Sequence, residues 1–356
     1  MSAPSRPKGP KGPQGPKDID NGDVVQAGPP PGSALTGVLG RLGSAQEVWI
    51  GLVLAVLVAA FSVLDPDSFA SSFNLLNLAA DAAILLLLAV GMTYVIISAG
   101  IDLSVGGILV FSGVTATKAM EATGASSIGS LLLGALVAVA TGLAWGVLNG
   151  ALVAYGRIPP LIVTLGTLGM SLGGALLITG GVDLRAPSRL NLGLGLDKIA
   201  GVPTIVWISI AVTIVLGVVL AQCRFGRHTY AIGSNVKAAR TSGVRVNRHL
   251  VKVYGLAGLL AGLAGYLSLA KYGITGVSAH STDNLQAIAA VVIGGTSLFG
   301  GVGTVTGTVI GVFIPAVLQN GFQILGVKPF WQQVVVGAVL IAAVYLDQWR
   351  RKARDH

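Results

Sequence analysis

Charge is scarce in this chain of 356 residues, and that scarcity limits the class of protein. Only 10% of the residues are charged, whereas soluble domains carry about 25%. Apolar residues make up 53%, and the mean hydropathy is +0.79. Water therefore cannot be the main solvent for this surface. At roughly 20 apolar residues per spanning helix, the sequence predicts an all-α polytopic membrane protein with about ten transmembrane helices.

Residues that carry chemistry are also few. A single cysteine, Cys223, excludes an intrachain disulfide framework and a cysteine-rich metal site. No G-x-x-x-x-G-K-[ST] loop is present to hold nucleotide phosphates, and no Ser/His/Asp set is evident. The histidines lack metal-ligand spacing: His228, His249, His280 and His356. We therefore expect neither an enzyme nor a cofactor on this chain.

What is present divides the chain into three parts. Residues 1–46 are polar and rich in Pro and Gly, which favours a disordered tail. Residues 47–350 form the expected membrane domain, and residues 351–356 a short basic tail. No cleavable signal peptide is expected, because the first apolar run begins near Val48. The spans are expected at about 48–64, 78–98, 103–120, 128–150, 160–180, 203–222, 253–270, 285–298, 302–325 and 331–347.

Basic residues orient these spans. Most of the 23 lysines and arginines fall on the side that holds both termini and the segment 223–252. The other side holds Lys118, Arg185, Arg189, Lys198, Lys271 and Lys328. The positive-inside rule therefore predicts that both termini and segment 223–252 are cytoplasmic. Because the basic residues lie beside apolar spans, the net charge of +9 is interpreted as a topology signal and no nucleic-acid partner is expected.

Three stretches are too rich in Gly, Pro or polar residues for plain lipid-facing helices: 98–107, 157–160 and 293–301. Irregular backbone at membrane depth survives only inside protein or beside a wet cavity, so these are candidates for broken or re-entrant helices. Asp102 and Asp283 each begin a similar run of small residues, five spans apart. An odd offset is typical of an inverted repeat, although composition alone also explains the likeness.

Segment 223–252 is the longest expected cytoplasmic loop. From Arg224 to Lys252 it contains seven basic residues and no acidic one. Its centre, residues 235–243, predicts a short helix that ends at Gly243. Such a helix, small on one face and basic on the other, suits a groove of a cytoplasmic partner. A solvated loop that merely obeys the positive-inside rule explains the composition equally well.

Three motifs carry a family resemblance. The sequences GMTYVIISAGIDLSVG at 91–106, GRIPPLIVTLGT at 156–167 and VIGGTSLFGG at 292–301 closely resemble ribose-type permeases of bacterial ATP-binding-cassette sugar importers. The resemblance runs in order from about residue 48 to 350. It implies a permease in the bacterial inner membrane that pairs with a second copy. Its other implied partners are a cytoplasmic ATPase, which holds ATP and Mg²⁺, and an extracytoplasmic sugar-binding protein.

The same resemblance assigns a coupling role to the basic segment. Residues 237–243 resemble the Glu-Ala-Ala-x-x-x-Gly motif by which such permeases contact their ATPase. The departure is Lys237, which stands where the motif often has an acid, so charge complementarity at this contact is in question. The expected coupling residues are Asn235, Lys237, Ala238, Ala239, Arg240 and Gly243.

A sugar path needs hydroxyl and amide groups that exchange weak hydrogen bonds with the substrate. The polar candidates in or beside the spans are Thr93, Asp102, Ser104, Asn149, Thr164, Thr167, Gln286, Gln319 and Asn320. For each, a helix–helix hydrogen bond is the competing explanation. Asp102 would also suit the cap of a helix beginning at Leu103.

The leading hypothesis is a permease subunit of an ATP-driven importer for a small neutral sugar or polyol. A self-sufficient secondary transporter or facilitator, and a permease for branched-chain amino acids, are the alternatives. No paired acids or histidines suggest a proton relay around Asp81 and Asp102, which favours an external energy source.

Overall fold

The computed structural model describes residues 45–124, 127–276, 280 and 282–328, with scattered positions between 331 and 345. The described chain is almost entirely helical. Its only described strands form two short antiparallel ladders, β1 (Leu184–Arg185) with β4 (Ile274–Thr275) and β2 (Lys198–Ile199) with β3 (Val202–Pro203). The expected tails, 1–46 and 351–356, lie outside the described residues except for the first residues of α2.

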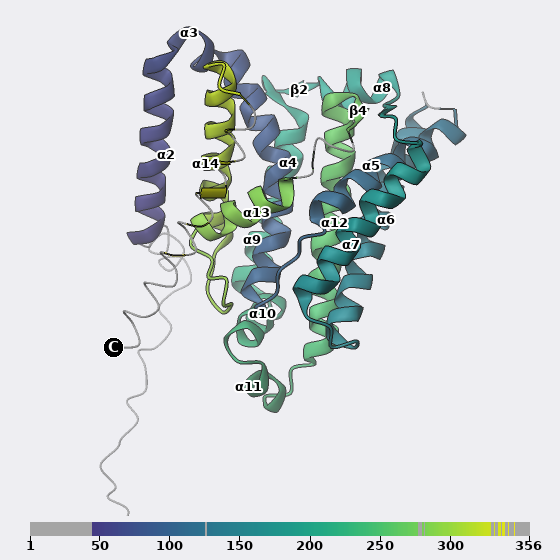
Figure 1. Cartoon of the computed structure of the whole chain (residues 1–356), viewed down its shortest axis with the longest axis vertical. Coiled ribbons are helices and arrows are strands. Elements are labelled where there is room, and N and C mark those ends of the chain that lie inside the picture. Colours follow the sequence, from purple (N-terminus) through teal and green to yellow (C-terminus); the bar gives the residue numbers. More distant parts are fainter. Residues whose placement is uncertain are drawn as a thin grey trace, which may run out of the picture. The chain divides into compact units, whose positions relative to one another are not determined.

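The helices follow one another with short connections. The first half contains α2 (Ala45–Leu64), α3 (Pro66–Phe69), α4 (Ser72–Ile97), α5 (Val105–Ala122), α6 (Ile128–Ala154) and α7 (Pro160–Thr179). The second half contains α8 (Ser188–Leu190), the π-helix η1 (Asn191–Gly195), α9 (Thr204–Gln222), α10 (Arg224–Ser234), α11 (Val236–Thr241), α12 (Val246–Tyr272), α13 (Asp283–Ile293) and α14 (Val305–Ile324). Figure 1 shows α3 at one end of the long helices and α11 at the other. We call these the α3 end and the α11 end.

Seven of the described helices are long and apolar enough to cross a membrane: α2, α4, α6, α7, α9, α12 and α14. Their apolar side chains face outward on the peripheral helices. On α2, only 6% of the most apolar stretch is buried, whereas 94% is buried on α4. An exposed apolar surface of this kind needs lipid as its solvent. The all-α polytopic membrane fold predicted from composition is confirmed.

Each expected span up to residue 325 contains a helix, but two boundaries differ in a way that matters. Helix α12 begins at Val246, several residues before the expected start. The predicted start was too late because hydropathy detects apolar surface and misses the polar first turns of the helix. Helix α13 has only 11 residues, or about 17 Å, so the expected span at 285–298 is wrong as a continuous crossing. Gly294 and Gly295 end it early. The expected span at 331–347 lies outside the continuously described residues.

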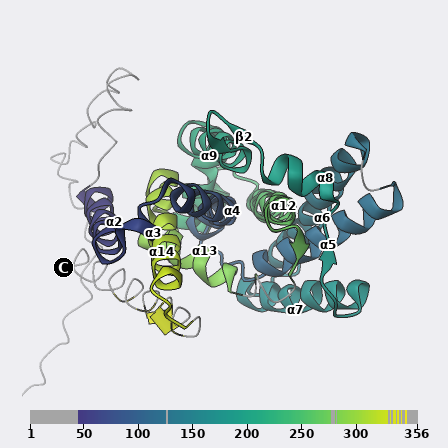
Figure 2. The same cartoon turned by 90° about the horizontal axis from the view of Figure 1, so that it is seen from above.

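Two long helices, α4 and α12, form the buried centre. Figure 2, seen from above, shows α12 between α4 and the pair α5 and α6. Glycines allow α6 and α12 to touch backbone to backbone. A Cβ added at Gly142 would lie 2.2 Å from the Gly258 carbonyl oxygen, and one at Gly146 would lie 2.2 Å from the Tyr254 carbonyl oxygen. This seam is the close packing that the high glycine content predicts for membrane helices.

The glycine-rich stretches are breaks between helices, as expected. Helix α4 ends at Ile97 and α5 begins at Val105, with Ala99 at a φ of 60°. Residues 294–304 separate α13 from α14, and residues 155–159 separate α6 from α7. Each of the two long buried helices is followed by a connection and a shorter helix, α4 by α5 and α12 by α13. Because α4 runs from the α3 end and α12 from the α11 end, their directions agree with an inverted repeat, which stays a prediction.

Candidate translocation cavity and coupling segment

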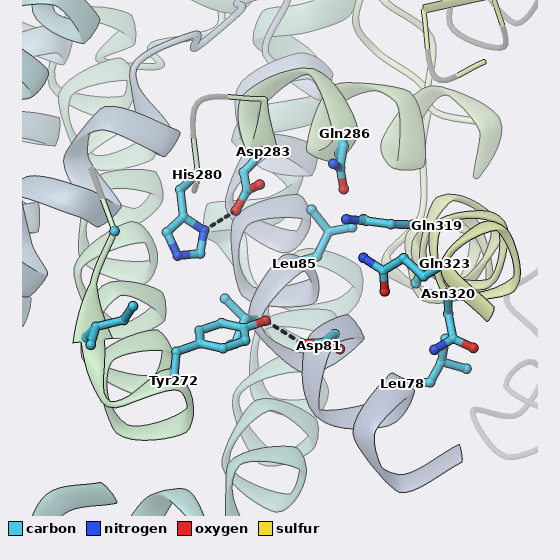
Figure 3. A pocket seen from close by; sticks show the side chains of 14 residues that line it. Leu78, Asp81, Leu85, Tyr272, His280, Asp283, Gln286, Gln319, Asn320 and Gln323 are labelled. Carbon is cyan, nitrogen blue, oxygen red and sulfur yellow. Dashed lines mark hydrogen bonds and ion pairs between the residues drawn. The ribbon is translucent and has the colours of Figure 1, made fainter. Parts of the chain in front are cut away.

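A cavity of about 380 Å³ lies toward the α3 end, between α4, the end of α12, α13 and α14. Figure 3 shows Gln286, Gln319 and Gln323 directed into this space, opposite the pair Asp81 and Tyr272. Its lining is largely polar. The lining residues are Leu78, Asp81, Ile84, Leu85, Tyr272, Ile274, Gly276, His280, Asp283, Gln286, Ala316, Gln319, Asn320 and Gln323.

Amide side chains dominate the α13 and α14 walls of the cavity. Each amide offers a carbonyl acceptor and an NH₂ donor, so it can pair with a hydroxyl group in either direction. Asn320 is held by Asn74 of α4 through two reciprocal hydrogen bonds of 2.9 and 2.8 Å. Within the described part of the chain, the side chains of the three glutamines have no such partner. They are therefore the freer donors and acceptors of the described lining.

Two polar clusters complete the opposite wall. The Asp81 carboxylate accepts hydrogen bonds from Lys271 Nζ and Tyr272 Oη, and Lys271 Nζ also donates to the Asn77 carbonyl at 3.2 Å. The Lys271 side chain is only 12% exposed, whereas that of Asp81 is 47% exposed. The carboxylate therefore faces the cavity and the ammonium group lies behind it.

The second cluster centres on His280. Its Nδ1 lies 2.7 Å from Asp283 Oδ2, and its Nε2 lies 2.8 Å from Ser268 Oγ. Both ring nitrogens thus have partners, which fixes the orientation of the ring. The described cavity wall contains two carboxylates and no lysine or arginine.

Three of the expected path residues line this cavity: Gln286, Gln319 and Asn320. Sequence reasoning missed Tyr272 and Gln323, and it did not assign Asp81, His280 or Asp283 to a site. One signal for Gln323 was available, because it lies one helical turn after Gln319 and so shares its face. The others come together only through the tertiary fold.

Asp102, Ser104 and Asn149 form a separate buried cluster. Asp102 Oδ1 accepts a hydrogen bond of 2.8 Å from the Ser104 backbone N–H and another from the Ser104 hydroxyl. Asn149 Nδ2 donates to Ser104 Oγ at 2.8 Å. The carboxylate does accept a backbone N–H, but α5 begins at Val105, so the expected cap of a helix starting at Leu103 is wrong in register.

The three expected threonines are buried, and their hydroxyls bond within the protein. Thr93 Oγ1 lies 2.7 Å from Thr308 Oγ1 and joins α4 to α14. Thr164 Oγ1 donates to the Pro160 carbonyl at 3.0 Å, and Thr167 Oγ1 to the Val163 carbonyl at 3.1 Å. None of them lines the cavity of this structure. Thr93 makes the helix–helix hydrogen bond of the competing explanation, whereas the bonds of Thr164 to Pro160 and of Thr167 to Val163 lie within α7.

At the other end, the predicted short helix is present as α11. Asn235 caps it by accepting a hydrogen bond of 3.0 Å from the Ala238 N–H, and Gly243 follows its end with a φ of 82°. Lys237, Ala238 and Arg240 are exposed. Ala239 is only 4% exposed and packs against Ile232 and Val246.

The expected loop 223–252 is therefore a folded unit of α10, α11 and the first turns of α12. The short helix predicted at its centre is present, so the alternative of an unstructured solvated loop does not hold. Small residues also let α10 pack closely. A Cβ at Gly233 would lie 1.7 Å from the Ile97 carbonyl oxygen and 2.6 Å from the Gly301 nitrogen. That nitrogen donates to the Ile97 oxygen at 2.8 Å.

Tyr230 strengthens this contact, since its hydroxyl donates to the Gly303 carbonyl at 2.7 Å. We call Ile97, Tyr230, Gly233, Gly301 and Gly303 the glycine junction. It joins α10 to the end of α4 and to the 294–304 break. Sequence reasoning missed this junction, although it singled out both breaks.

Comparison with known proteins agrees with these features. The family model described as "Branched-chain amino acid transport system / permease component" matches residues 74–344. The chain belongs to this permease family. No solved structure matches the permease.

Curated relatives cover most of the permease. It is 39% identical over 304 residues to the ribose import permease protein RbsC of Escherichia coli K12, covering 83% of this chain and 92% of the relative. It is 40% identical over 315 residues to RbsC of Bacillus subtilis 168, covering 88% and 94%. The D-allose transport system permease protein AlsC of E. coli K12 is 36% identical over 296 residues, covering 83% and 90%.

Proposed function

We propose that this permease is the membrane subunit of an ATP-binding-cassette importer for a small neutral sugar or polyol. The observation that carries the proposal is the amide-lined cavity at the α3 end. Gln286, Gln319 and Gln323 offer donors and acceptors that suit a ring of hydroxyl groups. Relatives named for ribose and D-allose import support a sugar over a branched-chain amino acid.

The charges around the cavity favour a neutral substrate. Asp81 and Asp283 place carboxylates at the wall, and Lys271, which pairs with Asp81, is not part of the described lining. A sugar acid or sugar phosphate would lose its hydration without gaining a described cationic partner. We therefore expect anionic sugars to compete poorly for transport.

The energy source is proposed to be a separate ATPase, which would hold ATP and Mg²⁺. The permease sequence has no phosphate-binding loop of its own. Helix α11 presents Lys237, Ala238 and Arg240 to solvent and suits the groove of such a partner. A second permease copy and an extracytoplasmic binding protein complete the proposed importer.

The proposed orientation places the α11 end in the cytoplasm, together with both termini, in the bacterial inner membrane. Its support is the concentration of arginine and lysine along α10, α11 and the start of α12. The cavity then faces the side from which a binding protein would deliver sugar. Substrate would enter there and leave past the 98–104 and 294–304 breaks.

Reconstitution tests the ATPase contact. The permease, its genomic neighbour ATPase and the binding protein would be assembled in liposomes, and ATP-driven ribose uptake would be measured. Ala238→Trp adds bulk to the exposed face of α11 and should weaken ATPase binding about tenfold or more. Ala239→Trp would not separate loss of the ATPase contact from misfolding, because Ala239 packs inside the unit formed by α10, α11 and α12.

A matched control is Ala122→Trp, the same substitution at the exposed end of α5, remote from α11. It should leave ATPase binding unchanged. Ribose uptake by the permease alone, driven by a gradient and indifferent to ATP, would contradict the proposal in favour of a secondary transporter.

A further inference from the structure

A second cleft lies at the α11 end, with a volume of about 370 Å³. Three separate segments surround it: the turn between α6 and α7, helix α11, and the start of α12. Its described lining contains four arginines and no acidic residue. The lining residues are Tyr155, Arg157, Arg240, Val244, Arg245, Val246, Asn247 and Arg248.

The arginines keep their hydrogen-bonding capacity. Within the described residues no ion pair involves Arg157, Arg240, Arg245 or Arg248, and their one recorded side-chain bond joins Arg240 Nη2 to Asn247 Oδ1 at 3.5 Å. Four like charges around one cleft repel each other. A bound anion would relieve that repulsion and accept bidentate hydrogen bonds from the guanidinium groups.

The backbone adds to the positive potential. Helix α12 has 27 residues, and its first turn lines the cleft. Arg245 at the N-cap provides no side-chain hydrogen bond, and the N–H groups of Asn247 and Arg248 have no recorded acceptor among the described residues. Arg157 is held at a φ of 55°, an unfavourable backbone conformation for a residue other than glycine. The turn thus keeps Arg157 beside the cleft at some conformational cost.

An exposed apolar face begins directly beside the cleft. Tyr155 lines the cleft and is 59% exposed, while Leu161, Ile162 and Leu165 are more than half exposed along α7. An aromatic ring at the boundary between a basic cleft and an apolar helix face is typical of the membrane interface. Acyl chains could lie along α7 while a headgroup occupies the cleft.

We propose that this cleft binds a phosphate group, and that the adjoining apolar face makes an anionic phospholipid its source. Basic pockets between helix ends are known to bind anionic headgroups. The site is separate from the sugar cavity. One of its lining residues, Arg240, belongs to α11, the helix proposed to contact the ATPase. A lipid bound there would brace α11 against the turn between α6 and α7.

The test compares two probes on purified full-length permease. In nanodiscs or detergent micelles, binding of phosphatidylglycerol would be measured against phosphatidylcholine, and inorganic phosphate would be titrated at constant ionic strength. The double variant R245Q/R248Q should weaken phosphatidylglycerol binding about tenfold or more, because two charge-assisted contacts are lost. The control R224Q/R227Q removes the same charge from α10, outside the cleft, and should bind as the wild type does.

Each outcome decides a part of the proposal. Phosphatidylglycerol binding that only R245Q/R248Q weakens supports the lipid source. Sensitivity to inorganic phosphate alone would keep the phosphate site and overturn the lipid source. Equal effects of both double variants, or no binding of either probe, would overturn the site, and a loss confined to ATPase binding would assign the cleft to that partner. The conservative variant Arg248→Lys, which keeps charge but loses bidentate geometry, guards against misfolding and should show an intermediate loss.

Discussion

The two ends of the permease differ in the groups that make their contacts: polar side chains at the α3 end and backbone atoms at the glycine junction. At the α3 end, glutamine and asparagine side chains line one side of an open cavity of about 380 Å³. At the glycine junction, Gly233 has no side chain, so α10 lies directly against the backbone of Ile97 and Gly301. Side chains can adjust to a moving substrate, whereas backbone contacts leave no soft group between two segments. The first end is suited to contact with a solute and the second to transmission of movement.

Disruption of the junction should have the largest effect. Gly233→Leu places atoms where the Ile97 oxygen now lies, since even a Cβ would be 1.7 Å away. Overpacking of this kind costs about 1–3 kcal/mol or more. We expect ATP-driven uptake to fall about tenfold or more, with a lower melting temperature of the purified protein.

Gly217→Leu is the matched control, because its added Cβ would lie at an ordinary 3.6 Å from Val305. It should retain most of the uptake. Gly233→Ala tests the same contact with the smallest change, and wild-type uptake in that variant would remove the junction from the coupling route.

The cavity should respond through affinity, with the fold intact. Gln319→Ala removes one donor and acceptor from the lining, and a single hydrogen bond contributes about 0.5–1.5 kcal/mol. We expect the concentration for half-maximal uptake to rise about two- to tenfold, with an unchanged melting temperature. Gln222→Ala, outside the cavity at the end of α9, serves as control. An equal loss in both variants would show that the cavity does not contact the substrate.

Local signals account for what the sequence predicted well. Short stretches of sequence are enough to recognise the apolar spans, the glycine-rich breaks and the ends of α11 at Asn235 and Gly243. Helix α12 shows the limit of this reasoning. Its first turns carry Arg248 and Lys252, so they look like a loop to any measure of apolar surface although they are helical.

The site was less predictable because it depends on contacts between distant segments. Asp81 and Tyr272 are 191 positions apart and share a hydrogen bond. Gly233 looks like any small residue until Ile97 and Gly301 are placed beside it. Polar residues such as Thr93 and Asn149 have the same sequence character as the cavity glutamines, yet they are buried between helices. Only the fold separates a residue that binds solute from one that binds another helix.

Charge at the cavity wall should have a smaller effect, on selectivity. Asp81→Asn keeps the shape of the side chain and leaves Lys271 without its carboxylate. The wall then becomes more positive, so we expect an anionic sugar such as ribonate to inhibit uptake about two- to fourfold more strongly than in the wild type. The measurement is competition against labelled ribose. Unchanged competition would mean that Asp81 does not act on the solute.

The smallest expected effect belongs to Tyr230→Phe. This variant keeps the ring and removes only the hydroxyl that donates to the Gly303 carbonyl at 2.7 Å. One hydrogen bond contributes about 1 kcal/mol, so the junction should loosen without coming apart. Because the backbone contacts of the junction remain, uptake should fall by less than about twofold, while the ATPase activity that continues without uptake should rise. Tyr345→Phe removes a hydroxyl elsewhere and is the control. If Tyr230→Phe raised only the half-maximal sugar concentration, as Gln319→Ala should, the division between a solute-binding end and a force-transmitting end would fail.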